Sequence, residues 1–204
     1  AVPAQTAERV VRSAPVSELR FEVGLAAEEA FLQSLRVTAR FKVEGREPVL
    51  LSMPSWTPGS YEVANFARHV SAFTAMQAGR ELRWDKLDPD TWRVIPAGRG
   101  EVTLEYRVRA DTLDNARAWT REDFGFFNGT TVFLMVEGRP ETPAAVRVRT
   151  EPNWLVATGM TPGDSARRWV ARDVHDLMDH PFFVGKFDLD SMRVAEKWMR
   201  LATY

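Results

Sequence analysis

The stretch LRVTARFKVE, residues 35–44, alternates apolar and polar side chains along its whole length. Its odd-numbered positions are all apolar, and its even-numbered positions are all polar or charged. A period of two places successive side chains on opposite faces of a β-strand, so this stretch predicts a strand with one buried and one solvated face. The stretch EVTLEYRVRA, residues 101–110, repeats the pattern. Because strands with one wet face are typical of antiparallel sheets, the two stretches predict such a sheet.

Further short runs of β-forming residues are separated by turn signals. These runs lie at residues 18–23, 49–53, 73–77, 81–87, 91–95, 131–136, 146–149, 154–158 and 182–187. The loop PAGRG, residues 96–100, has the length of a hairpin connection. Helical patterns are short and lie at residues 26–33, 61–69 and 174–178, so no helix is long enough to organise the fold. The sequence predicts an all-β fold, an antiparallel sandwich or a saddle-like pair of sheets with short helical turns.

The chain of 204 residues contains no internal repeat and no Gly/Ser-rich linker. We therefore expect one β-rich domain over residues 18–204, preceded by a flexible N-terminal segment over residues 1–17. The last stretch, residues 192–204, is rich in apolar side chains and has no terminating Gly, Pro or polar tail, so we expect the natural chain to continue. The small, polar opening residues fit a segment left by signal cleavage, which leaves the compartment open between a periplasmic or secreted location and the cytoplasm.

The composition excludes several classes of function. Twenty-seven Lys and Arg residues against 28 Asp and Glu residues give a formal net charge of −1, without the basic excess that binding to nucleic acid requires. No apolar run approaches the ~20 residues of a membrane-spanning helix, so we expect no membrane partner. The absence of Cys excludes disulfides, thiol catalysis and Cys-ligated metals.

The stretch HDLMDH, residues 175–180, places two His and two Asp side chains within six positions. On a helix, ligands at i and i+4 share a face, whereas the i to i+5 spacing of His175 and His180 separates them by about 140°. Pro181 also disfavours helical geometry at His180. We therefore expect a polar turn here and assign no metal ligand. No Gly-x-Ser-x-Gly nucleophile turn is present, so no catalytic residue is assigned either.

Two aromatic stretches interrupted by turns are the strongest candidates for contact with a partner. WTPGSY, residues 56–61, and FGFFNGT, residues 124–130, each combine large rings with a glycine-containing turn. Rings on loops are common at interfaces, and Trp56, Phe126 and Phe127 are the interface candidates. We expect the polar Asn128-Gly129 step to be a turn, with Gly129 free to take a positive φ.

Three composite segments resemble the N-terminal domain of the glycyl aminopeptidase family, zinc metallopeptidases of the gluzincin group that are related in architecture to aminopeptidase N. The family pattern P-x-W-x-P-G-S-Y, with a short N/D-F-A-R run after it, falls on residues 54–61 and 65–68. A G-x-x-N-G-T turn falls on residues 125–130. A D-x-L-x-D-x-P turn is similar to the stretch that ends at Pro181, although Asp176 here stands directly before Leu177. Order and spacing agree over most of the chain.

The resemblance implies a parent enzyme in which this β-rich domain precedes a thermolysin-like catalytic domain with an HExxH motif and, usually, a PDZ-like domain. This chain contains no HExxH, so zinc, its ligands and the general-base Glu are expected beyond Tyr204, and the chain alone should hold no cofactor and be inactive. The implied partners are the parent's own downstream catalytic domain and its peptide substrate. By the same resemblance, Tyr61, Asn128 and Gly129 are candidates for a surface that faces the substrate cleft.

Other hypotheses stay open at this point. The segments around Tyr61 and Asn128 could simply hold β-turns and the domain interface. A freestanding β-sandwich module that binds peptide or carbohydrate through its aromatic loops is the alternative from another class, and a purely structural subunit is a third. An HExxH motif encoded after Tyr204 favours the peptidase, whereas a stop codon there favours the module.

Overall fold

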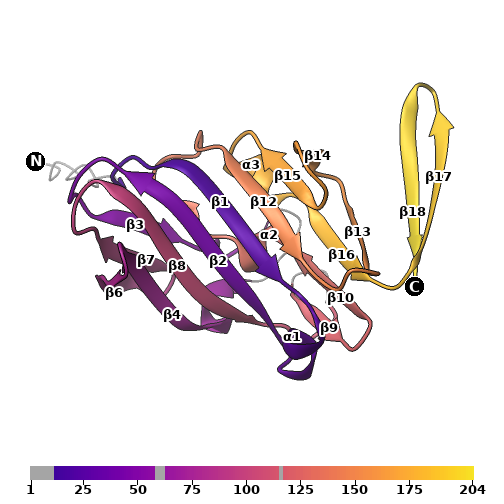
Figure 1. The fold of residues 1–204 in the computed structure, drawn as a ribbon, viewed down its shortest axis with the longest axis horizontal. Coiled ribbons are helices and arrows are strands. Elements are labelled where there is room, and N and C mark those ends of the chain that lie inside the picture. Colours follow the sequence, from indigo (N-terminus) through magenta and orange to yellow (C-terminus); the bar gives the residue numbers. More distant parts are fainter. Residues whose placement is uncertain (1–11, 58–62, 115–116) are drawn as a thin grey trace, which may run out of the picture.

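Four β-sheets form the part of the protein that the computed structural model describes, residues 12–57, 63–114 and 117–204 (Figure 1). The largest has eight strands in the order β14-β15-β12-β1-β2-β8-β4-β5. Their bounds are β1 Ser17–Gly24, β2 Ser34–Val43, β4 Val70–Gln77, β5 Arg80–Glu81, β8 Gly100–Arg109, β12 Ala144–Arg149, β14 Thr161–Pro162 and β15 Arg168–Ala171. Neighbouring strands are antiparallel except β1 and β12, which are parallel.

The two strands predicted from alternation lie side by side in this sheet. In the register of β2 and β8, Val37 is opposite Tyr106 and Ala39 is opposite Leu104. The apolar positions of both strands are almost completely buried, whereas Arg36 and Lys42 keep contact with solvent. One face of the sheet therefore contributes to the core, as the period-two pattern predicts.

Two four-stranded sheets cover the buried face of the large sheet. One has the order β11-β3-β7-β6, and the other has the order β13-β16-β10-β9. Their bounds are β3 Val49–Ser52, β6 Arg83–Asp88, β7 Thr91–Ile95, β11 Met135–Val136, β9 Trp119–Arg121, β10 Phe124–Asn128, β13 Leu155–Thr158 and β16 Pro181–Gly185. The ring of Phe73 in β4 stacks on Trp92 in β7 at 5.5 Å, and Trp169 in β15 meets Phe182 in β16 edge-on at 5.7 Å. These contacts join the layers into one hydrophobic core and confirm the predicted all-β, sandwich-like fold.

Only short helices interrupt the strands in the part of the chain that the structure describes. They are α1 Ala27–Phe31, the 3₁₀ helix η1 Phe66–His69, α2 Gly129–Val132 and α3 Val174–Met178. The predicted helical range 174–178 coincides with α3, where the carboxylate of Asp173 accepts the backbone N–H of Asp176 at 2.8 Å and caps the helix. Within the described residues, no helix is long and apolar enough to cross a bilayer.

The region of residues 124–136 differs from the prediction. Residues 131–136 were expected to form a strand, but α2 occupies the start of this range and only Met135–Val136 is a strand. Conversely, Phe124–Asn128, expected as part of a loop, is strand β10. Strand β10 buries Phe124, Gly125 and Phe127 and leaves Phe126 and Asn128 partly exposed, and a Cβ on Gly125 would lie 2.5 Å from the Leu25 side chain. Burial alternates over residues 125–128, but the residue types do not, because Gly125 takes an inward position and Phe126 an outward one, and the pattern therefore missed this strand.

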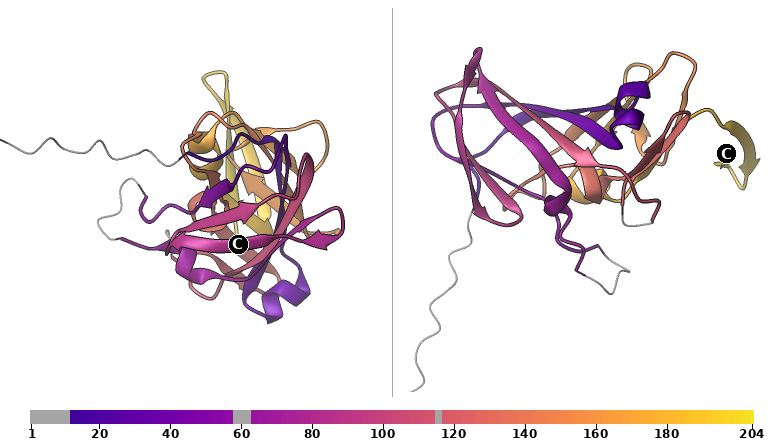
Figure 2. Two further views of the ribbon diagram at one scale, coloured as in Figure 1. Left: turned by 90° about the vertical axis from the view of Figure 1, so that its left-hand side faces the viewer. Right: turned by 90° about the horizontal axis from the view of Figure 1, so that it is seen from below.

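At the N-terminal end a packed residue lies within the segment expected to be flexible, and the C-terminal end forms a separate hairpin. Residues 1–11 lie outside the described part, but Ser13, inside the segment predicted to be flexible, is buried, and its hydroxyl accepts the N–H of Leu50 at 3.0 Å. The packed part therefore begins before residue 17. At the other end, β17 Asp188–Val194 and β18 Lys197–Thr203 form a two-stranded hairpin that stands away from the body (Figures 1 and 2).

Candidate functional site

Helix α2 lies where the three motif segments of the sequence meet. It follows β10 directly, and it contacts both η1 from the first motif and α3 from the third. The backbone N–H of Gly129 donates to the carbonyl of His180 at 3.2 Å, which links the second and third motifs. Segments separated by more than forty residues are therefore brought to one place at the edge of the core.

The first motif reaches this place through η1. Ser55 holds the base of its loop, because the Ser55 carbonyl accepts the N–H groups of Ala64 at 2.8 Å and of Asn65 at 3.0 Å. Asn65 has a φ of 47° and a ψ of 60°, a left-handed conformation that Asn tolerates better than most residues, and η1 begins immediately after it. Tyr61, a predicted cleft residue, lies outside the described residues.

Gly129 has a different structural role from the predicted one. It begins α2 and does not have a positive φ. A Cβ at this position would lie 2.3 Å from the carbonyl oxygen of Leu177 and 2.9 Å from Cα of Met178. Gly129 is therefore needed because the backbones of α2 and α3 approach each other closely, and not because of turn conformation.

The remaining candidates divide by exposure. The side chain of Trp56 is 50% exposed, and Phe126 and Asn128 are partly exposed. Phe127, in contrast, is completely buried and stacks on Phe182 at 4.7 Å with an interplanar angle of 9°. Because Phe127 points into the core, its ring contributes no exposed interface on this domain.

The recess between η1 and α2 is small, and both apolar and polar residues line it. Its free volume is about 10 Å³, and Phe66, His69 and Thr131 are among the residues that line it. This is room for about one water, so these residues alone form no pocket for a peptide. Burial, together with the nearby cations Arg68 and Arg117, lowers the pKa of His69. A neutral His69 fits the geometry, since Nε of Arg68 donates to His69 Nε2 at 3.1 Å.

A family model for the peptidase M61 N-terminal domain matches residues 23–186, which is most of the chain and includes all three motif segments. The chain belongs to this family. The resemblance to the N-terminal domain of gluzincin aminopeptidases is thereby confirmed.

Solved structures share the fold of this M61 domain. An aminopeptidase N family protein from Idiomarina loihiensis matches with a TM-score of 0.80 and 24% identity over 90% of this chain and 32% of that protein. A variant of an M1 zinc metallopeptidase from Deinococcus radiodurans, bound to a Tyr-Ser-Ala substrate, matches with a TM-score of 0.51 and 16% identity over 93% of this chain and 47% of its own. Leukotriene A4 hydrolase from Saccharomyces cerevisiae matches with a TM-score of 0.51 and 9% identity over 89% and 30% of the two chains.

At these identities the matches show a common fold alone. The M61 domain spans less than half the length of each of these solved proteins. No curated protein matches the sequence.

The M61 domain does not offer a ligand set for zinc in its described residues. No group of three or more His, Asp or Glu side chains there is arranged to hold a metal ion. His175 is exposed on α3, whereas His180 Nε2 lies 3.4 Å from Asp176 Oδ1. The backbone N–H of Arg172 donates to Asp176 and is the main cause that lowers the pKa of this carboxyl group. The HDLMDH stretch thus forms a capped helix with a local contact between His180 and Asp176.

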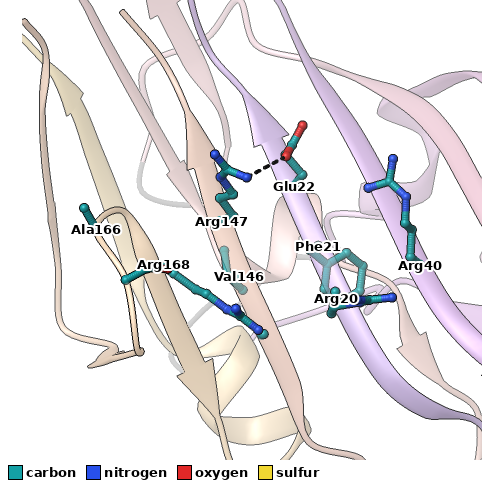
Figure 3. A pocket seen from close by; sticks show the side chains of 10 residues that line it. Arg20, Phe21, Glu22, Arg40, Val146, Arg147, Ala166 and Arg168 are labelled. Carbon is teal, nitrogen blue, oxygen red and sulfur yellow. Dashed lines mark ion pairs between the residues drawn. The ribbon is translucent and has the colours of Figure 1, made fainter. Parts of the chain in front are cut away.

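An open hollow of about 480 Å³ lies on the outer face of the large sheet (Figure 3). Four arginines line it: Arg20, Arg40, Arg147 and Arg168. Three of their guanidinium groups have carboxylate partners, namely Glu101 for Arg20, Glu22 for Arg147 at 3.9 Å, and Asp164 for Arg168 at 3.2 Å. The mixture of charges is typical of a solvated sheet face, and we assign no ligand to it.

Sequence reasoning missed two residues that support α2. The Tyr106 hydroxyl donates to the carbonyl oxygen of Val132 at 2.7 Å, although Tyr106 lies in β8. The Thr131 hydroxyl donates to the carbonyl oxygen of Asn128 at 2.8 Å. A Tyr at an apolar position of an alternating strand is a weak signal for such a bond, because a buried phenol needs a partner.

Tyr106→Phe is expected to lower the free energy of unfolding at neutral pH by about 1 to 3 kcal/mol, because it leaves the buried Val132 carbonyl without its donor. Burial also raises the pKa of Tyr106 well above its ordinary value. Above about pH 10 the unfolded phenol loses its proton while the folded one keeps it, so this contribution to stability is complete below pH 10 and decreases as the pH rises.

Urea unfolding curves of the natural chain and of Tyr106→Phe between pH 7 and pH 11 measure both the loss at neutral pH and its change with pH. Above pH 10 the free energy of unfolding should decrease less steeply in the variant than in the natural chain. Tyr204→Phe is the control for stability at pH 7, since Tyr204 is 57% exposed. Equal losses in the two variants at pH 7 would contradict a structural role for the Tyr106 hydroxyl.

Proposed function

We propose that this chain is the non-catalytic N-terminal domain of a zinc metallo-aminopeptidase of the glycyl aminopeptidase type. In this proposal it packs on a catalytic domain in the same parent chain and helps to shape that domain's substrate cleft. The family match over residues 23–186 is the observation that carries the proposal. The freestanding binding module has no comparable support.

The position of the motif segments supports a role at the cleft. The three segments that define the resemblance meet at α2 through η1, β10 and α3, and two of the segments carry a partly exposed candidate side chain, Trp56 and Asn128. The recess beside α2 has room for about one water, so a substrate cleft at this place needs a second wall. In the proposal, the catalytic domain provides that wall.

The division of chemical roles follows from the side chains that are present. In the proposal, zinc, its ligands and the general base would belong to the catalytic domain, where bound zinc would supply Lewis-acid chemistry. The residues of this chain contribute orientation and exclusion of solvent. An amide such as that of Asn128 offers one acceptor and two donors for a peptide backbone or a free amino group.

Asn128→Ala in the parent enzyme is expected to lower kcat/KM for an aminoacyl substrate about tenfold, which corresponds to the loss of one hydrogen bond of about 1.4 kcal/mol. Steady-state kinetics of the purified parent enzyme measure this. The matched control is Asn153→Ala, because Asn153 is exposed in the turn before β13.

Two results would contradict the proposed role. Unchanged kcat/KM together with reduced stability would mean that Asn128 only braces the turn. A parent protein without zinc-dependent aminopeptidase activity would contradict the proposed function as a whole.

A further inference from the structure

The β17–β18 hairpin carries apolar side chains on both of its faces. In its register, Met192 is opposite Met199 on one face, and Arg193 is opposite Trp198 on the other. Six large apolar side chains of the hairpin are 40% to 66% exposed: Leu189, Met192, Val194, Trp198, Met199 and Leu201. A soluble ribbon exposed on both faces would normally be polar, so this concentration marks a surface that is covered in the complete protein.

The hairpin also lacks the support that a sheet needs. It pairs only with itself among the described strands, so the outer edge of each strand has backbone groups without a strand partner. An isolated two-stranded hairpin is at best marginally stable in water. Its turn places both Ala195 and Glu196 at positive φ, a conformation that favours Asn and Gly. Additional strands would pair the free edges of the hairpin, and cover on both faces would stabilise it against the cost of its strained turn.

The hairpin is attached to the body only at its base. The ring of Tyr204 stacks on Phe124 at 4.5 Å, and its hydroxyl donates to Asp123 Oδ1 at 3.0 Å. Phe187, just before β17, packs edge-on against the same Phe124 at 6.2 Å. The chain thus leaves and rejoins the body at one aromatic cluster, while the strands point away from it (Figures 1 and 2).

The extent of the family match indicates what covers the hairpin. The match to the M61 N-terminal domain ends at residue 186, two residues before β17 begins. The hairpin therefore lies outside this domain family, although the core and the motif segments lie inside it. The solved proteins that share the fold are more than twice as long as the part that this chain covers, so they contain a further body of protein.

We propose that β17 and β18 are the first two strands of a sheet that the catalytic domain of the parent enzyme completes, with both faces of the hairpin buried in that domain. This inference rests on the proposed function, because the occupant is the catalytic domain. It assigns residues 188–203 to the second domain and places the boundary between the domains at the aromatic cluster of Phe124, Phe187 and Tyr204.

Hydrogen–deuterium exchange tests the proposal with the natural sequence. We expect the amides of residues 189–203 to exchange on the order of 100-fold more slowly in the parent enzyme than in the 204-residue chain, because closed strands open much less often than exposed ones. Amides in β2, which is buried in both proteins, serve as the internal control. Equally fast exchange of the hairpin in both proteins would overturn the inference.

A substitution tests whether the faces are buried. Leu201→Asp is expected to lower the thermal midpoint of the parent enzyme by several degrees, and that of the 204-residue chain by less than about one degree, since a charge is costly only where it is buried. Leu87→Asp is the control, because Leu87 is exposed on β6 at the far end of the body (Figure 1). Similar small effects of Leu201→Asp in both proteins would overturn the inference.

Two further measurements show whether the hairpin is covered by a second copy and whether the proposed function itself fails. Hairpin protection in the 204-residue chain that rises with protein concentration, together with a dimer in light scattering, would assign the surface to a second copy and overturn the inference. Zinc-dependent aminopeptidase activity is measured on the same parent sample. An active parent with an unprotected hairpin refutes only this inference, whereas an inactive parent with a protected hairpin refutes the proposed function and with it the identity of the occupant.

Discussion

Gly129→Ala is expected to lower the free energy of unfolding of the 204-residue chain by about 3 kcal/mol, at the upper end for added volume in a filled core. The new Cβ would lie 2.3 Å from the carbonyl oxygen of Leu177 and 2.9 Å from Cα of Met178. Both are backbone atoms, so no side-chain rotation relieves the overlap, and α2 must move away from α3. Urea unfolding followed by tryptophan fluorescence measures the loss.

The matched control for this substitution is Gly98→Ala. A Cβ at Gly98 would meet nothing within 4 Å, and Gly98 does not have a positive φ. We expect no loss there, or a gain of about 0.4 to 1 kcal/mol from reduced freedom of the unfolded chain. If Gly129→Ala changed the free energy of unfolding as little as Gly98→Ala, the close approach of α2 and α3 would be contradicted.

Phe182→Ala is expected to lower the free energy of unfolding by about 3 to 5 kcal/mol, the range for removing a buried aromatic ring. Phe182 is completely buried and stacks on Phe127 at 4.7 Å, and the edge of the Trp169 ring meets it at 5.7 Å. Its ring therefore joins the small sheet that carries Asn128 to the large sheet. The denaturation midpoint and its slope give the loss, and retained far-UV circular dichroism in dilute buffer shows that the variant still folds.

Phe31→Ala is the control for the aromatic substitution, since Phe31 in α1 is 87% exposed. We expect a change within about 0.5 kcal/mol, as for most surface substitutions. A comparable loss from both variants would mean that the layers are not held together by the Phe127–Phe182–Trp169 contacts.

Most strands could be predicted because their pattern is local. Residues 35–44 and 91–95 correspond closely to β2 and β7. In a strand with one solvated face, apolar and polar residues alternate, so the burial of the strand can be predicted from the sequence. Strand β10 and the hairpin were missed for related reasons. In β10 an inward position is Gly125 and an outward one is Phe126, and residues 188–203 carry apolar side chains on both faces, so in neither segment do apolar and polar residues alternate cleanly.

Only part of the candidate site could be predicted from the sequence. The motif segments were identified from composite patterns, and Trp56 and Asn128 are indeed partly exposed. Nothing in the sequence indicated that Phe127 faces the core, because neighbouring aromatic residues in a strand look alike until the sheet assigns them to faces. The role of Tyr61 stays a prediction, because it lies outside the described residues.

By itself, the sequence determined that the domain is all-β, that it resembles the N-terminal domain of a gluzincin aminopeptidase, and that it has no HExxH motif. Those properties depend on residue types and on short-range spacing. Only the tertiary structure decided that the three motifs meet at α2, that Gly129 is required by the backbone of α3, and that the β17–β18 hairpin stands away from the body. Each of these depends on contacts, or on missing contacts, between residues far apart in the chain, and such contacts leave no periodic pattern in the sequence.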